Sequence, residues 1–162
     1  MATLQAAIVQ VLKDDPILTT PEPAGLGFGD VYGKWLVDGD APGAEPDAFT
    51  TGGRIAPNVV VMMGDRNPNP GVNVPGWAKW DQFVTVYLFH YPGDHGKDVL
   101  EQAALTVEDA LTAANLTITG DQRPKIHPNP NVNDIDDPEQ FPGNYVKVLR
   151  FRVTGLRAVP IT

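Results

Sequence analysis

A glycine-containing segment between an apolar stretch and a helical pattern raises the question of nucleotide binding. A phosphate-binding loop needs two glycines separated by four residues and followed by Lys and then Ser or Thr, so that amides surround the phosphates and the hydroxyl holds magnesium. Here two residues separate Gly93 from Gly96, and Lys97 is followed by Asp98. A carboxylate cannot replace the hydroxyl and repels a phosphate. The segment therefore predicts a corner between a strand and a helix, in which Gly93 turns the chain and Asp98 favours the helix start.

The same corner offers donors for a metal ion. Asp94, His95 and Asp98 bring oxygen and imidazole groups within five residues. Turns are rich in such residues for other reasons, and the sequence has no HExxH or EF-hand spacing. Residues 133–139 contain several carboxylates but lack the Gly and the terminal Glu of a calcium loop. We expect no metal and no cofactor, and we keep a small nucleotide- or metal-dependent enzyme using residues 93–98 as an alternative of another class.

Nucleophilic chemistry has little support in the sequence. The chain has no Ser and no Cys, which excludes a GxSxG motif and thiolate catalysis. His90, His95 and His127 are expected on a strand, a turn and a loop, with no nucleophile beside them. Carboxylate-pair chemistry stays open, although no spacing favours it. We predict that the chain is not an enzyme and has no catalytic residues.

Composition and charge restrict the class of partner. The 162 residues include 12 Lys and Arg against 20 Asp and Glu, a net charge of -8, so diffuse attraction to nucleic acid or anionic lipid is not expected. The 16 Gly and 16 Pro indicate an ordered domain with long, turn-rich loops. No apolar run approaches a membrane span and no leader opens the sequence. We expect one soluble domain, residues 1–162, made in the cytoplasm.

Apolar periodicity predicts the elements that position these residues. Residues 4–12 carry a helical stripe that Thr3 can cap and Pro16 can end. Residues 31–37 predict a short strand, and residues 57–63 predict a covered one. After the glycine corner, a helix of about five turns is expected, with an Ala-rich packing face. Its apolar positions are Val99, Leu100, Ala103, Val107, Ala110, Leu111 and Ala114.

Two further strands show a period of two. Residues 82–91 place Val84, Val86, Leu88 and His90 on one face and Phe83, Thr85, Tyr87 and Phe89 on the other. The last strand, from residue 145, directs Leu149, Phe151 and Val153 one way and Arg150, Arg152 and Thr154 the other. The order of elements predicts an α+β domain, with a mostly antiparallel β-sheet, two main helices packed on one face, and long loops at residues 64–80 and 120–144.

A short motif, P-N-P-x-V-N, occurs in both predicted loops, at residues 68–73 and 128–133. It indicates either two related arms that reach a partner or a neighbouring subunit, or repeated use of good turn residues. Long loops in a small domain are usually functional or disordered. Two tryptophans beside the first loop suit an interface, since aromatic anchors are enriched there, or else close the bottom of the core. The candidate interface residues are Trp77, Trp80, Asn69 and Asn129.

Four segments together resemble a known family. They are the opening helix LQAAIVQVLKDD, the middle stretch RIAPNVVVMMGD, the strand and helix FVTVYLFHYPGDHGKDVLEQAALTVEDAL, and the closing strand VLRFRVTGL. In order and character they resemble the tail terminator (tail completion) proteins of long-tailed bacteriophages. The two long loops depart from the pattern of that family.

The resemblance implies a structural virion protein without a catalytic site. Such a protein forms a hexameric ring that caps the tail tube, ends tube polymerisation and joins the tail to the head connector or a head-closure protein. It is made in the host cytoplasm and resides at the tail end or neck. DNA passes through the lumen without specific binding, which an acidic lumen would favour. A head-closure or neck adaptor protein of the head-tail junction is the alternative within this class.

In a heterologous ring, each subunit presents one patch to a different patch of the next. The outward face of the last strand carries Arg150 and Arg152, which we place opposite acids of a neighbouring subunit. A solvated strand face is the equal alternative.

Overall fold

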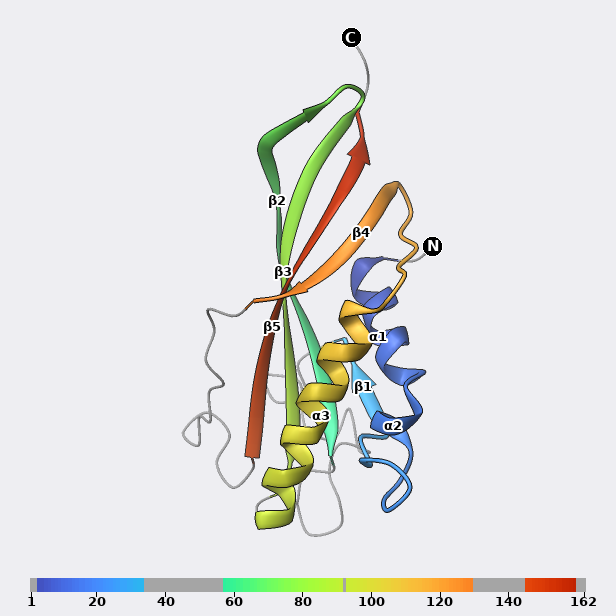
Figure 1. Ribbon diagram of the computed structural model, residues 1–162, viewed down its shortest axis with the longest axis vertical. Helices are drawn as coiled ribbons and strands as arrows, with labels where there is room; N and C mark the ends of the chain where they lie inside the picture. Colours follow the sequence, from blue (N-terminus) through green and yellow to red (C-terminus); the bar gives the residue numbers. More distant parts are fainter. Residues whose placement is uncertain (1–2, 34–56, 92, 130–144, 160–162) are drawn as a thin grey trace, which may run out of the picture.

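The computed structural model describes residues 3–33, 57–91, 93–129 and 145–159 (Figure 1). The helices are α1 (Leu4–Lys13), α2 (Pro16–Thr19) and α3 (Asp94–Thr112). The strands are β1 (Asp30–Tyr32), β2 (Asn58–Val74), β3 (Trp77–His90), β4 (Asp121–Pro128) and β5 (Tyr145–Ala158).

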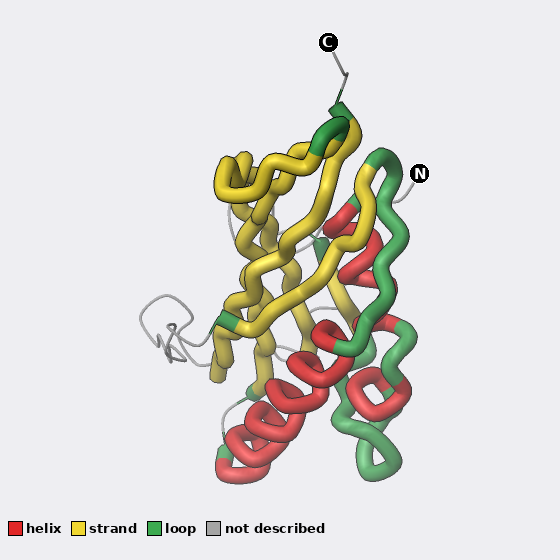
Figure 2. Tube along the Cα trace, turned by 45° about the horizontal axis from the view of Figure 1, so that its top comes forward, coloured by secondary structure: helices red, strands yellow, loops and turns green. Residues whose placement is uncertain are grey.

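The strands form one sheet in the order β1-β2-β3-β5-β4. Only β1 and β2 are parallel, and every other neighbouring pair is antiparallel. The main helices α1 and α3 lie on the same side of the sheet (Figures 1 and 2). The predicted α+β class, with a mostly antiparallel sheet and two main helices on one face, is confirmed.

Helix α1 follows its apolar stripe. Leu4, Ile8 and Leu12 are buried, and the hydroxyl of Thr3 accepts a hydrogen bond from the Ala6 amide at 3.1 Å. As predicted, α1 ends before Pro16, at Lys13. Pro16 opens α2, where a first helical residue needs no N–H. The Asp15 carboxylate caps α2 by accepting from the amides of Ile17 and Leu18, both at 3.0 Å.

Strand β1 covers the start of the predicted strand at residues 31–37; residues 34–37 lie outside the described part of the chain. Its three residues pair in parallel with the start of β2. The side chain of Gln5 connects α1 to this edge of the sheet. Its Nε2 donates to the carbonyl oxygens of Gly33 at 2.6 Å and Val61 at 2.9 Å.

The prediction of a long loop at residues 64–80 was wrong. Strands β2 and β3 continue through it and form a hairpin that turns at Gly76, whose φ is 81°. Register shifts between Met63 and Arg66, and between Pro68 and Asn73, interrupt the β2–β3 ladder. Beyond the short β1, this part of β2 is an edge of the sheet, where proline is tolerated because one side of the backbone needs no partner.

The second predicted loop, residues 120–144, was also partly wrong. Strand β4 occupies its first part and pairs with β5 from Asp121 opposite Arg157 to Pro128 opposite Phe151. Strand β4 is the other edge of the sheet and has a register shift between Gln122 and Lys125, which again accommodates proline. Residues 130–144 lie outside the described part.

The core lies between the helices and the inner face of the sheet. Its helical side includes Val99, Leu100, Ala103, Val107 and Leu111, while β3 contributes Val84, Val86 and Leu88. A second buried cluster, Val60, Phe89, Val146 and Val148, lies on the outer face, away from the helices. Both predicted face assignments of β3 and β5 agree with this arrangement.

The ends of α3 differ from expectation. The helix begins at Asp94, with Gly93 as its N-cap at a φ of 139°, so Asp98 lies in the second turn and does not start the helix. The helix ends at Thr112, before Ala114. In the described part of the chain, no helix has the length and apolar character needed to cross a membrane.

Candidate subunit interface

The glycine corner is packed against the protein itself. A Cβ at Gly96 would lie 2.5 Å from the carbonyl oxygen of Tyr91 and 2.9 Å from Nδ1 of His90. Glycine is therefore required for α3 to approach the end of β3 so closely. The neighbouring hollow is lined by the carboxylates of Glu22 and Asp98. This surrounding charge is unfavourable for a phosphate.

At the glycine corner, His95 is a possible metal ligand that contacts another side chain of the protein. His95 donates from Nε2 to Glu22 Oε1 at 2.8 Å, and the pair is largely exposed. Over the described residues, no group of three or more His, Cys, Asp or Glu side chains could hold a metal ion. The acidic segment at residues 133–139 lies outside those residues.

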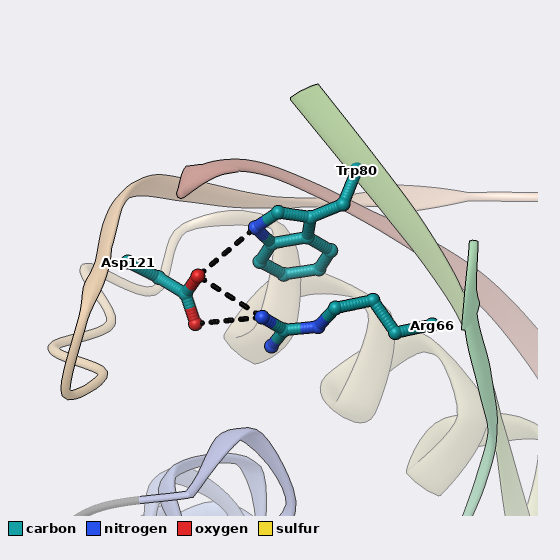
Figure 3. Close-up of polar contacts among 3 residues, drawn as sticks. All are labelled: Arg66, Trp80 and Asp121. Atoms are coloured by element: carbon teal, nitrogen blue, oxygen red, sulfur yellow. Dashed lines mark hydrogen bonds and ion pairs between the residues drawn. The ribbon is translucent and has the colours of Figure 1, made fainter. Parts of the chain in front are cut away.

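A buried polar cluster joins three strands at the upper part of the sheet (Figure 3). Trp80 Nε1 donates to Asp121 Oδ1 at 3.1 Å. Arg66 Nη1 lies 3.0 Å from each carboxylate oxygen of Asp121, and its guanidinium carbon lies 3.8 Å from the Trp80 ring centroid. The Asp121 side chain is 4% exposed, so its interactions with Trp80 and Arg66 take the place of hydrogen bonds to water. The cluster holds β2, β3 and β4 together.

This cluster places Trp80 in the core, as the alternative interpretation expected. The residue is 3% exposed, and a Cβ at Gly155 would lie 2.5 Å from its Cζ2 atom. Trp80 therefore has almost no free surface for a partner in this conformation, and its place in an interface stays a prediction. Sequence analysis missed Arg66 and Asp121 because both stood in predicted loops, 55 residues apart.

The other candidates lie on the sheet or beside it. Trp77 is half-buried at the start of β3, opposite Val74 and Ala158. Asn69 falls within β2, so the first P-N-P-x-V-N motif is part of a strand and not of a loop. Asn129 follows β4, and its amide donates to the Arg150 carbonyl oxygen at 3.0 Å. Residues 130–133 of the second motif lie outside the described part.

Arg150 and Arg152 lie exposed on the outer face of the sheet, where the strand pattern placed them. Strand pairing puts Arg152 opposite both Phe83 and His127, and Thr154 opposite Lys125. Lys79 lies on the same face, two alternations from Phe83 along β3. We call this surface the basic face. It comprises Lys79, Lys125, His127, Arg150 and Arg152, around the exposed Phe83 and with two carboxylates, Asp65 and Asp81.

The lowered pKa of His127 reflects burial and, in part, the positive charge of the basic face. Partial burial lowers the pKa of His127, and the positive charges of Lys125, Arg152 and Lys79 lower that pKa further. Its Nε2 lies 3.3 Å from the Thr154 hydroxyl. Three cations close enough to act on one imidazole show that the basic face is a cluster in space, although its members come from three strands.

An acidic surface of comparable size lies on α3. Its members recur at intervals of four and three residues, so they form one stripe along the helix. We call this stripe the acidic ridge; it comprises Asp94, Asp98, Glu101, Leu105 and Glu108. Leu105, in the middle, is 65% exposed. A groove of about 470 Å³ separates this side of α3 from β5, with Glu101 and Glu108 on one wall and Lys147 and Arg150 on the other.

Comparison with known proteins finds a similar fold in a chain of a virion. No protein-family model and no curated protein matches the chain. A chain of the virion of a native gene transfer agent (GTA) particle matches with a TM-score of 0.53 and 20% sequence identity, and the match covers 94% of each chain. At this identity, the likeness establishes a shared fold.

Proposed function

We propose that this chain is a structural subunit of a phage-like virion and not an enzyme. The observation that carries the proposal is the fold shared with a gene transfer agent virion chain over 94% of both chains. A match of this extent includes the whole arrangement of helices and sheet and is not limited to one common motif. The resemblance of four sequence segments to tail terminator proteins supports the same class independently.

The finer proposal is a hexameric ring that caps the tail tube, ends its polymerisation and joins the tail to the head connector. Opposite charges on α3 and on the outer face of the sheet suit a heterologous, head-to-tail contact between subunits. The net charge of -8 agrees with a lumen through which DNA slides without specific binding. The protein would be made in the host cytoplasm and reside at the tail end or neck of the virion.

Solution mass and imaging test the ring directly. Light scattering on a size-exclusion column should give six times the subunit mass, and negative-stain images of that peak should show a central hole. A protein that is monomeric at every concentration and salt level, and absent from purified particles, would contradict the proposal.

Particles made without the protein distinguish a terminator from the head-closure or neck adaptor alternative. Loss of a terminator should give tail tubes of excess length, because nothing stops tube polymerisation. Loss of an adaptor should give tails of normal length that are detached from heads. Electron micrographs of particles from cells lacking the gene measure both outcomes.

Calorimetric titration tests the enzyme alternative. We expect no specific binding heat from magnesium nucleotides or from divalent cations alone, because Glu22 and Asp98 line the hollow beside the glycine corner. Stoichiometric binding that is lost in a Gly96→Ala variant with native-like circular dichroism would favour the enzyme.

A further inference from the structure

Positive and negative charges gather on two surfaces of this subunit, which meet at the groove between Glu101 and Arg150. Helix α3 carries five carboxylates, Asp94, Asp98, Glu101, Glu108 and Asp109, against the single cation Lys97. The basic face carries two lysines and two arginines against the two carboxylates Asp65 and Asp81. In a chain with a net charge of -8, a cationic surface of this kind is not a consequence of average composition. It requires a cause, and an acidic partner is the simplest one.

Each charged surface has an exposed apolar residue within it. Phe83 is 45% exposed and lies directly opposite Arg152 in the sheet. Leu105 is 65% exposed and lies midway between Glu101 and Glu108 on α3. A large apolar side chain surrounded by charged groups is the arrangement of an interface centre with a polar rim.

The two surfaces have similar lengths. Glu101 and Glu108 are seven residues apart, or about 10 Å along a helix. Arg150 and Thr154, the latter opposite Lys125, are four residues apart, or about 13 Å along a strand. A helix laid on the basic face can therefore bring Leu105 to Phe83 while acids at both ends approach cations.

We propose that the basic face of one subunit binds the acidic ridge of α3 on a second copy of this chain. The inference rests on the proposed ring and assigns its subunit contact. The two surfaces differ, so the contact is head-to-tail, and its repetition closes a ring or extends a filament. Phe83 packs on Leu105 at the centre. Arg150 approaches one of the acids Glu101 and Glu108, and Arg152 with Lys125 approaches the other.

Exchange of charge between the two surfaces tests the contact. One variant carries Arg150→Glu with Arg152→Glu, and the other carries Glu101→Lys with Glu108→Lys. Each alone should be monomeric, because like charges then meet at every contact. An equimolar mixture should assemble again, since each variant retains one native surface and the altered surfaces complement each other. The restored ring alternates the two variants and therefore has an even number of subunits.

Matched controls separate the contact from general charge effects. Lys13→Glu changes an exposed lysine at the end of α1, and Asp109→Lys changes an exposed acid of α3 outside the acidic ridge. Both should assemble like the unaltered protein. Circular dichroism should show native secondary structure for all variants. Light scattering at matched concentrations measures assembly.

The chain contains no cysteine, so single introduced cysteines can detect the contact by disulfide cross-linking. This measurement does not depend on how much of the protein is assembled at equilibrium. Phe83→Cys protein mixed with Leu105→Cys protein should form disulfide-linked heterodimers at least tenfold faster than either protein forms homodimers. Gel electrophoresis without reductant measures the products. Equal rates of heterodimer and homodimer formation would overturn the proposed pairing.

The outcomes distinguish this inference from the proposed function. Rings that form equally well in all variants would overturn the contact and leave a ring built through other surfaces. Charge-reversed variants that stay monomeric when mixed would also overturn the pairing. An unaltered protein that never assembles and shows no preferred cross-link would overturn both the contact and the ring.

Discussion

At the scale of residues, Asp121 is the acceptor at the centre of the buried polar cluster. It accepts from Trp80 and pairs with Arg66 while its own side chain is 4% exposed. Stacking of the guanidinium on the indole orients both donors toward the carboxylate (Figure 3). Asp121 and Trp80 are buried and Arg66 is partly exposed, so removing the carboxylate leaves the Trp80 N–H and the Arg66 guanidinium without their acceptor.

The first prediction concerns this cluster. Asp121→Ala should lower the free energy of unfolding by about 2 to 3 kcal/mol, because the Trp80 N–H and the partly exposed Arg66 lose their acceptor. Urea denaturation measures the change. The matched variant Asp65→Ala, at an exposed position, should cost less than about 0.5 kcal/mol. A loss at Asp121 no larger than this control would contradict a stabilising role.

Acid sensitivity follows from His90, which is 1% exposed. Burial lowers the pKa of His90 below its ordinary value of 6.5; the hydrogen bond to the Tyr91 carbonyl and the charge of Glu22 oppose this shift, and His95 adds to it. A histidine with a lowered folded pKa binds its proton more readily after unfolding. Its contribution to stability is therefore fully present above pH 6.5 and is lost as the pH falls from that value through the lower pKa of the folded protein.

The second prediction is that His90→Phe reduces the loss of folding stability that occurs when the pH is lowered. Stability at pH 7.5 should fall modestly, because the hydrogen bond to the Tyr91 carbonyl is lost. The difference between the free energies of unfolding at pH 7.5 and pH 5.5 should shrink, since the carboxylates titrate alike in both proteins. Urea denaturation at both pH values measures it. An unchanged difference would show that His90 does not carry the acid response.

At the scale of elements, α3 packs closely on the sheet because small residues face it. Ala103 is fully buried and Ala104 nearly so, and Gly96 allows contact with the end of β3. The helix contributes a long row of core residues, while its opposite side carries the acidic ridge. One element therefore serves the core and the proposed contact through different faces.

The third prediction is that Ala103→Leu destabilises by about 1 to 3 kcal/mol through overpacking. Ala113→Leu, at the exposed C-cap of the same helix, adds the same volume outside the core and should change stability by less than about 0.5 kcal/mol. Urea denaturation compares the two. Equal effects would mean that α3 is not held at close distance to the sheet.

At the scale of the whole molecule, the helices lie on one side of the sheet (Figure 2), so the acidic ridge of α3 and the basic face belong to different layers. Charges at the rim of an interface govern encounter rate and register more than total affinity. The apolar contact between Phe83 and Leu105 would contribute the part of the association free energy that salt does not screen.

The fourth prediction follows from the combination of a charged rim and an apolar centre in the proposed contact. Raising NaCl from 0.1 M to 1 M shortens the screening length from about 10 Å to about 3 Å, so subunit association should weaken by roughly tenfold or more. Phe83→Ser should weaken association at both salt levels alike, since it removes the apolar contact. Sedimentation velocity over a concentration series measures both. Association that strengthens with salt would indicate a predominantly apolar contact.

Local patterns in the sequence were sufficient for much of this protein. The stripe of α1, the packing face of α3 and the two faces of β3 and β5 follow from periods of 3.6 and two residues, which need no knowledge of distant segments. The spacing around Gly93 was likewise enough to argue against a phosphate-binding loop. The α+β class followed from the order of these elements.

Only the tertiary structure decided the edge strands, the buried polar cluster and the clustering of charge. The proline-containing stretches of β2 and β4 are strands because the neighbouring strands, β3 and β5, supply their hydrogen bonds. The β-propensity of a residue does not depend on which strand lies beside it, so it could not predict these strands. Asp121 meets Trp80 across 41 residues and Arg66 across 55. The basic face similarly gathers side chains from three strands whose register is set by pairing. Each depends on contacts between distant segments, which no local period encodes.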